Sequence, residues 1–211
     1  KIISKHDLFK TAIHIEQDLI KENVGSQDQV WAACGGFNTI DFLQNGHIVV
    51  EPIIMMEEHL SLFKEKFILV FTGLSRYASE IVQEQIKNTA FKFKELQEMR
   101  QLVDEAERIL KDGKGEFNEF GKLLNENWKL KRSLSSKVTN PKIDQVYEIA
   151  MRNGAVGGKL LGAGGGGFLL FYAEPEYHNA IKFALKDCLK VPFEFDFSGS
   201  EIIVYQPNYY Q

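Results

Sequence analysis

The sequence predicts an α+β fold in which an antiparallel sheet is covered by helices on one face. Short apolar runs such as residues 67–71 and 168–173 are typical of buried strands, and long amphipathic segments separate them. A glycine-rich loop joins strand 157–161 to strand 168–173, which makes these two strands a hairpin. From residue 63 onward the predicted order is β-α-α-α-β-β-α-β-β, and an antiparallel sheet with a helical layer buries these faces.

The composition excludes several classes of protein. The chain has 211 residues and a formal net charge of −4. It lacks the excess of basic residues expected of a protein that binds a nucleic acid. No apolar run reaches the roughly 18 residues that a membrane helix requires, so we expect no membrane partner. Two cysteines, Cys34 and Cys188, are too few for a disulfide framework or a zinc cluster, which favours a reducing, cytoplasmic location.

The first third of the chain contains clear local signals. Residues 4–22 are predicted to form an amphipathic helix that begins with a capping box at Ser4 and Asp7. His14 within this helix is interpreted as structural or solvated and not as catalytic. Residues 30–34 are predicted as a short helix ended by glycines, and residues 37–42 and 47–54 as a hairpin with Asn45-Gly46 as its two-residue turn.

The remainder is predicted to be rich in helices. A connecting region at residues 57–63 contains the expected domain boundary, and the polar turn 72–75 follows the first buried strand. Four helices are then expected over residues 76–110, 117–131, 140–153 and 175–189, the third of them capped by Asn140 and Pro141. Residues 191–197 and 202–205 are predicted as closing strands.

The glycine run is the strongest indication of a function. Five glycines fall within residues 162–167, and such a run lets backbone N–H groups approach an anion closely, which predicts a phosphate or nucleotide site. The spacing Gly162-x-Gly164-x-x-Gly167 also matches the dinucleotide fingerprint, but that fingerprint requires a helix directly after the glycines, and a strand follows here. A tight hairpin with only a structural role is the alternative.

Other candidate residues have two interpretations that the sequence leaves open. Asp28 lies near a predicted helix start, where it is either a capping residue or a carboxylate that accepts or orients a proton. Arg76 suits recognition of a phosphate or carboxylate, or a surface ion pair with a nearby Glu. The basic cluster containing Lys131 and Arg132 either meets an anionic ligand or faces water.

These segments resemble the GHMP small-molecule kinases. The resemblance is carried by Gly158-Lys-Leu-Leu-Gly-Ala-Gly-Gly-Gly-Gly-Phe168, which is similar to the third motif of that family, by Leu124-Asn-Glu-Asn-Trp128 and Asn140-Pro-Lys-Ile-Asp144, and by His14-Ile-Glu-Gln-Asp18, Gly25-Ser-Gln-Asp-Gln29, Gly35-Gly-Phe-Asn38 and Thr72-Gly-Leu-Ser-Arg76. It implies that residues 1–62 are the end of a lobe like ribosomal protein S5 domain 2, and that residues 63–211 form a ferredoxin-like α+β lobe, with the active site between the lobes.

The resemblance also implies an activity and roles for individual residues. ATP with Mg²⁺ would phosphorylate the anomeric hydroxyl of a sugar phosphate, with a heptose 7-phosphate as the expected substrate and galactokinase- or fucokinase-like specificity as the alternative. Asp28 would be the catalytic carboxylate, and no residue is assigned to a metal. The ATP phosphates would be met by Gly162, Ala163, Gly164, Gly165, Gly166 and Gly167, and the substrate by Gln27, Thr72, Ser75, Arg76, Lys131 and Arg132.

The chain departs from the family pattern in one respect. The Pro-x-x-x-Gly-Leu-Gly-Ser-Ser-like phosphate loop and the N-terminal basic residue of the family are not found in these residues. We expect both to precede Lys1 in a longer gene product, so the activity of this chain alone is left open. A non-catalytic binding module that retains the fold is the alternative from a different class, and a homodimer is left open.

Overall fold

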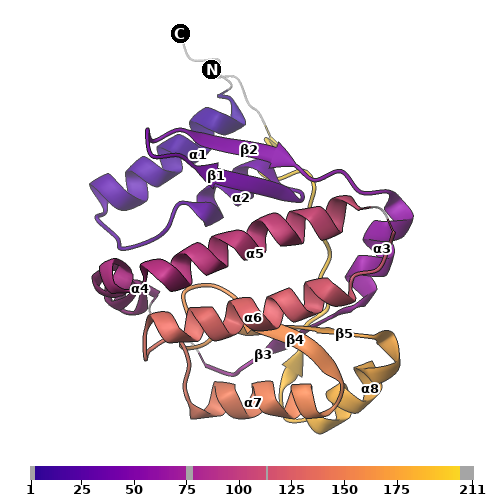
Figure 1. The fold of residues 1–211 in the computed structure, drawn as a ribbon. Coiled ribbons are helices and arrows are strands. Elements are labelled where there is room, and N and C mark those ends of the chain that lie inside the picture. Colours follow the sequence, from indigo (N-terminus) through magenta and orange to yellow (C-terminus); the bar gives the residue numbers. More distant parts are fainter. Residues whose placement is uncertain (1–2, 75–77, 113, 205–211) are drawn as a thin grey trace. The chain divides into compact units, whose positions relative to one another are not determined.

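The computed structural model describes residues 3–74, 78–112 and 114–204, which divide into two compact units (Figure 1). Unit 1 consists of Lys1–Pro52 and Glu194–Gln211, and unit 2 of Ile53–Phe193. The predicted boundary at residue 62 does not coincide with this division, because residues 53–62 group with the second unit and residues from 194 onward with the first.

Unit 1 begins with helix α1 (Lys5–Ile13), which continues into the π-helix η1 (His14–Leu19) and is followed by α2 (Gln27–Cys34). The predicted capping box is confirmed at its first half, since the Asp7 N–H donates to Ser4 Oγ at 3.0 Å. Strands β1 (Asn38–Phe42) and β2 (Ile48–Pro52) pair antiparallel, which confirms the hairpin. The predicted two-residue turn is wrong, because the Leu43 N–H donates to His47 O and the Gly46 N–H to Leu43 O, both at 2.9 Å, so the loop has three residues, 44–46. Phe9, Val30 and Ala33 form the core of this unit.

The C-terminal segment of unit 1 packs on the end of α2. A Cβ on Gly35 would lie 2.3 Å from the Gly199 nitrogen, so the two backbones meet where neither residue has a side chain. The Gly36 N–H donates to Asp196 O at 2.7 Å, and the rings of Phe37 and Phe195 have centroids 4.6 Å apart. The prediction of strands at 191–197 and 202–205 is wrong for the described residues up to 204, which contain no strand after Lys190.

Unit 2 contains a four-stranded antiparallel sheet and the remaining helices, which confirms the α+β class. The sheet order is β4-β5-β3-β6, with strands β3 (Phe67–Phe71), β4 (Ala155–Leu160), β5 (Phe168–Ala173) and β6 (Leu189–Lys190). The helices are α3 (Glu57–Glu65), α4 (Ala78–Asn88), α5 (Phe93–Lys111), α6 (Asn118–Leu134), α7 (Pro141–Arg152) and α8 (Pro175–Ala184).

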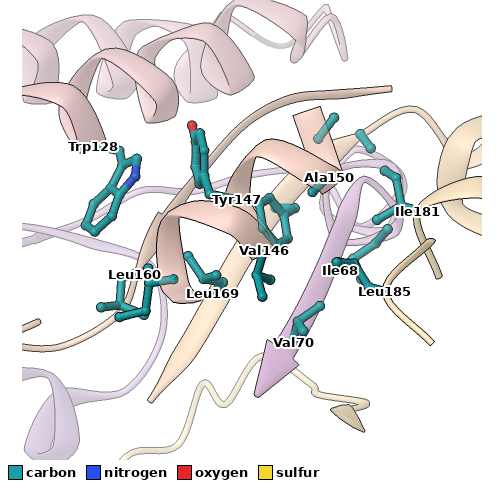
Figure 2. Packing of buried hydrophobic residues seen from close by; sticks show 14 of the residues in the cluster. Ile68, Val70, Trp128, Val146, Tyr147, Ala150, Leu160, Leu169, Ile181 and Leu185 are labelled. Carbon is teal, nitrogen blue, oxygen red and sulfur yellow. The ribbon is translucent and has the colours of Figure 1, made fainter. Parts of the chain in front are cut away.

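Helices cover both faces of this sheet, so the prediction of a single covered face is wrong. Ile68 and Val70 point to one face, where they join a core that includes Val146 of α7 and Ile181 of α8 (Figure 2). Side chains alternate along a strand, so Phe67 points to the other face, and its ring lies 4.8 Å from that of Phe63 in α3. The uninterrupted apolar sequence of β3 is typical of a strand buried on both sides.

Other predictions about the helices also differ from the structure. The long helix expected over residues 76–110 is divided by a 3₁₀ turn, η2 (Thr89–Phe91), and by Lys92, whose φ of −115° and ψ of 25° are not helical. The region 57–63, expected to be a connection, lies within α3, because its residue Phe63 packs in an aromatic cluster with Phe67 and Phe120.

Helix α6 lies directly against β4 at a contact between two glycines. A Cβ on Gly157 would lie 1.9 Å from the Gly121 carbonyl oxygen, and a Cβ on Gly121 would lie 2.5 Å from the Tyr172 ring. No side chain fits between these backbones. The contact therefore fixes the distance from α6 to the sheet.

We predict that Gly157→Ala lowers the free energy of unfolding by about 3 kcal/mol, because the added methyl group forces α6 away from β4. Urea denaturation followed by circular dichroism measures this change. Gly25→Ala is the control, since no atom lies within 4 Å of its added Cβ, and it should change the stability by less than about 0.5 kcal/mol. Equal stabilities of the two variants would contradict the packing argument.

Candidate functional site

The glycine run forms the loop of the β4–β5 hairpin, as predicted. The Leu161 N–H donates to Phe168 O at 2.8 Å at the base of the loop. Gly162, Gly164, Gly165 and Gly167 all have positive φ, between 72° and 127°, a range that other residues rarely adopt. Most glycines of the run are therefore required by the backbone conformation itself.

The loop packs closely against two other segments of unit 2. A Cβ on Gly164 would lie 2.8 Å from Val138 Cα, and one on Gly166 would lie 2.7 Å from Leu74 O. The Gly165 N–H donates to Val138 O and the Gly167 N–H to Leu74 O, both at 2.8 Å. These two amides already have protein acceptors, which leaves them unsuited to a phosphate oxygen.

Side chains from several elements bind the carbonyl oxygens of the loop. Lys131 Nζ donates to Gly162 O, Gln85 Nε2 to Ala163 O at 3.1 Å, and Asn140 Nδ2 to Gly165 O at 3.2 Å. The Thr72 N–H and hydroxyl both donate to Gly167 O at 2.9 Å. Within residues 3–74, 78–112 and 114–204, the amides without an acceptor are those of Gly162, Ala163, Gly164 and Gly166.

The structure places the predicted cations beside this loop but gives each a protein partner. Lys131 binds the Gly162 carbonyl, and Arg132 forms an ion pair with Asp144 at 3.0 Å. The same Asp144 oxygen accepts from the Thr139 hydroxyl at 2.7 Å. The expectation that Lys131 and Arg132 bind the substrate stays a prediction, and their observed contacts stabilise the loop and the start of α7.

Thr72, another predicted substrate residue, is only 2% exposed and binds the glycine loop. Gln27 is exposed in the first turn of α2. Ser75 and Arg76 lie outside the described residues.

Two polar groups near the loop were missed by the sequence analysis. Lys159 on β4 donates to Asn127 Oδ1 of α6 at 3.0 Å, and burial lowers the pKa of this lysine. Glu84 of α4 accepts from Ser135 Oγ at 2.8 Å and from Ser136 Oγ at 3.3 Å. Both are ordinary charged residues in amphipathic segments, so only the tertiary contacts distinguish them.

Asp28 lies in unit 1, in the first turn of α2, and is not the capping residue. The N-cap position is occupied by Ser26, whose hydroxyl accepts from Gln17 Nε2 at 3.0 Å. The Gln29 amide donates to Glu16 of the π-helix, so contacts on both sides of Asp28 hold this turn. Asp28 itself is exposed and has no hydrogen-bond partner among the described residues. A helix N-terminus favours a negative charge at this position.

The described residues show neither a metal-binding cluster nor a membrane-spanning helix. They contain no group of three or more His, Cys, Asp or Glu side chains placed to hold a metal ion. None of their helices combines the length and the apolar character needed to cross a membrane.

Comparison with known proteins identifies the segment that contains the glycine loop. Residues 102–190 match the family model described as GHMP kinases C terminal. This segment is a GHMP kinase C-terminal domain. The match includes β4, the loop and β5, and it agrees with the resemblance found in the sequence.

Individual relatives extend the likeness to most of the chain. D-glycero-alpha-D-manno-heptose 7-phosphate kinase of Campylobacter jejuni is 30% identical over 88% of this chain and 55% of its own length. The L-fucokinase/L-fucose-1-P guanylyltransferase of Bacteroides fragilis is 28% identical over 81% of this chain and 18% of its own length. The chain thus spans about half or less of these relatives.

A solved structure supports the fold. The crystal structure of a D-glycero-D-manno-heptose 1-phosphate kinase from Bacteroides thetaiotaomicron matches with a TM-score of 0.64, covering 97% of this chain and 57% of that chain. At 24% identity this similarity shows the GHMP kinase fold alone.

We predict that the contacts of Glu84 stabilise the protein in a pH-dependent way. Hydrogen bonds from Ser135 and Ser136, together with the charge of Lys137, lower the pKa of Glu84 from its ordinary value of 4.5. A lowered pKa in the folded state means that the stabilisation is present above pH 4.5 and is lost as the pH falls through the folded-state pKa.

Glu84→Gln should therefore be less stable than the wild type at pH 7, and the difference should shrink below pH 4.5. Urea denaturation from pH 3 to pH 8 measures it. Glu116→Gln, which changes an exposed carboxylate, is the control and should show no such pH dependence. A stability difference that does not vary with pH would contradict the role of the carboxylate.

Proposed function

We propose that this chain is the C-terminal part of an ATP-dependent kinase that phosphorylates the anomeric hydroxyl of D-glycero-D-manno-heptose 7-phosphate. The observation that carries the proposal is the 30% identity, over 88% of the chain, to a heptose 7-phosphate kinase. The glycine loop supports it, because four of its six amides have no acceptor among the described residues and suit a phosphate group.

The glycine loop would bind phosphate oxygens through backbone N–H groups. The amides of Gly162, Ala163, Gly164 and Gly166 serve this role, and those of Gly165 and Gly167 hold the loop in place. Mg²⁺ would arrive with ATP, because it is usually held by nucleotide phosphates and few protein ligands, and it supplies charge neutralisation when bound.

Asp28 would accept the proton of the anomeric hydroxyl as the sugar oxygen attacks the γ-phosphorus. The bond from oxygen to the γ-phosphorus forms as the bond between that phosphorus and the leaving ADP oxygen breaks, and the proton stays on the Asp28 carboxylate. An anomeric hydroxyl is more acidic than an ordinary alcohol, so a carboxylate is a sufficient base. The hydrogen bonds from Gln17 to Ser26 and from Gln29 to Glu16 would hold the first turn of α2 in place during the reaction.

The remaining predicted residues would serve substrate recognition. Arg76 would bind the phosphate of the sugar, since a guanidinium matches phosphate geometry. Gln27 and Ser75 would contact the sugar, and Thr72 would act by fixing the glycine loop.

The substrate assignment predicts a pattern of activity in the full-length protein. With MgATP, the heptose 7-phosphate should give the highest kcat/KM in a panel that also contains galactose, fucose and their phosphates. A coupled assay for ADP release measures each rate. Preference for unphosphorylated fucose or galactose would contradict the heptose assignment and favour the fucokinase- or galactokinase-like alternative.

We predict that Asp28→Asn in the full-length protein lowers kcat by about 10²- to 10⁴-fold, because general-base assistance is lost. KM values should change little, since the amide retains the shape of the side chain. Asp41→Asn, on β1 of the same unit, is a control for a lost carboxylate and should retain activity. Near wild-type turnover by Asp28→Asn would rule out Asp28 as the general base.

The alternative from a different class is a binding module without catalysis. In that case none of the sugars in the panel would be phosphorylated by the full-length protein, although phosphates would still bind to the glycine loop.

A further inference from the structure

Helix α4 packs against the rest of unit 2 through an unusually polar row of side chains. Ile81, Glu84, Gln85 and Asn88 are spaced by three, four and seven residues, which places them on one side of the helix. Ile81 is 2% exposed and packs in the main core. A surface helix ordinarily packs through an apolar stripe, whereas here three of the four side chains are polar.

Each polar side chain of this row bonds to one of two loops. Glu84 accepts from Ser135 and Ser136, and Asn88 Nδ2 donates to Leu134 O at 2.9 Å. These contacts fix α4 against the turn that follows α6. Gln85 lies between them and donates to the Ala163 carbonyl in the glycine loop at 3.1 Å. Helix α4 is therefore a support from which a single side chain reaches the tip of the loop.

A donor that binds a carbonyl oxygen also orients the next amide. The peptide group is planar and trans, so the N–H of one residue points opposite to the C=O of the residue before it. Because Gln85 binds Ala163 O, the Gly164 N–H points away from Gln85. In the same way Lys131 orients the Ala163 N–H through Gly162 O, and Asn140 orients the Gly166 N–H through Gly165 O.

The three oriented amides are three of the four that have no acceptor among the described residues. The amides of Gly165 and Gly167, in contrast, are directed to backbone oxygens of Val138 and Leu74. Three side chains from α4, α6 and the cap of α7 thus bind carbonyls at the peptides whose N–H groups remain available. Free N–H groups of this kind bind anions.

We propose that Gln85 is a positioning residue, which acts with Lys131 and Asn140 to orient the amides of Ala163, Gly164 and Gly166 toward a phosphate group. The inference rests on the proposed function for the source of that phosphate, which is either the nucleotide or the sugar phosphate. Gln85 is the informative position, because Asn140 also caps α7 through the Lys142 and Ile143 amides.

The test compares Gln85→Met with wild type in the full-length protein. Methionine retains the length of the side chain and removes the donor, which frees the peptide between Ala163 and Gly164 to rotate. Gln101→Met, at an exposed position of α5, is the matched control. Gln85→Glu is a second variant, because it keeps the shape and loses the donor when it is ionised. Thermal melts establish that each variant is folded.

Two measurements are made on each protein. Steady-state kinetics with MgATP and the heptose 7-phosphate should show KM for one of the two substrates raised about fivefold or more, the loss of roughly one hydrogen bond, with kcat changed less than twofold. The substrate affected identifies the source of the phosphate. Titration with inorganic pyrophosphate, followed by ¹⁵N NMR, should shift the Gly164 amide in the wild type and in Gln101→Met, and much less in both Gln85 variants.

The outcomes separate this inference from the proposed function. Wild-type KM values and an unchanged Gly164 response in the Gln85 variants would overturn the positioning role and leave the kinase proposal intact. Absence of any pyrophosphate response at the loop amides of the wild type would also overturn it. If no sugar phosphate is turned over but pyrophosphate shifts the Gly164 amide only when Gln85 is present, the kinase proposal fails and the positioning role is supported.

Discussion

The geometry of unit 2 depends on the contact between α6 and β4, where Gly121 and Gly157 bring two backbones together. Beyond this contact, α6 and the chain that continues from β4 extend over nearly equal distances. Ten helical residues rise about 15 Å and five extended residues about 16.5 Å, so the end of α6 remains beside the end of β4. Asn127 can therefore reach Lys159, and Lys131 the carbonyl of Gly162. A bulkier residue at the glycine contact would move the acceptor Asn127 away from Lys159 and the donor Lys131 away from the loop.

The glycine loop resolves two opposing requirements. A loop that binds an anion needs free N–H groups, yet a loop whose polar groups are all free would lose its conformation to chain entropy. Here two alternate amides are bonded to protein, as are the carbonyl oxygens of Gly162, Ala163, Gly165 and Gly167. The other four amides have no acceptor in the part of the chain that the structure describes. The positive φ angles and the contacts with Val138 and Leu74 make this arrangement compatible only with glycine at most positions. The glycine content serves rigidity as well as close approach.

The sequence was most informative where structure is determined locally. The β1–β2 hairpin, the end of α2 at Gly35 and the start of α7 at Asn140 were all predicted, because each depends on the conformational preferences of a few residues. The packing of Gly199 against Gly35 joins residues far apart in the chain, and no local pattern indicates it.

In the candidate site, too, the sequence revealed the residues with a local signal and missed the contacts between residues far apart in the chain. The glycine run was found because its composition is unusual, and Asp28 because of its family motif. Gln85 had no such signal, since a polar residue in an amphipathic helix is ordinarily assigned to the solvent face. Lys131 was noted for its charge, but its bond to a carbonyl could not be derived from charge alone.

Ala163, the one residue of the loop that is not glycine, links the packing of the core to the orientation of the amides. Its side chain packs against the main core of unit 2, and it lies between two peptides whose carbonyls are bound by Lys131 and Gln85. An apolar anchor at the Cα and a donor on each flanking carbonyl together restrict rotation of both peptide planes. Glycine at this position would keep both hydrogen bonds and lose the anchor, so the methyl group itself contributes to the orientation of the two N–H groups.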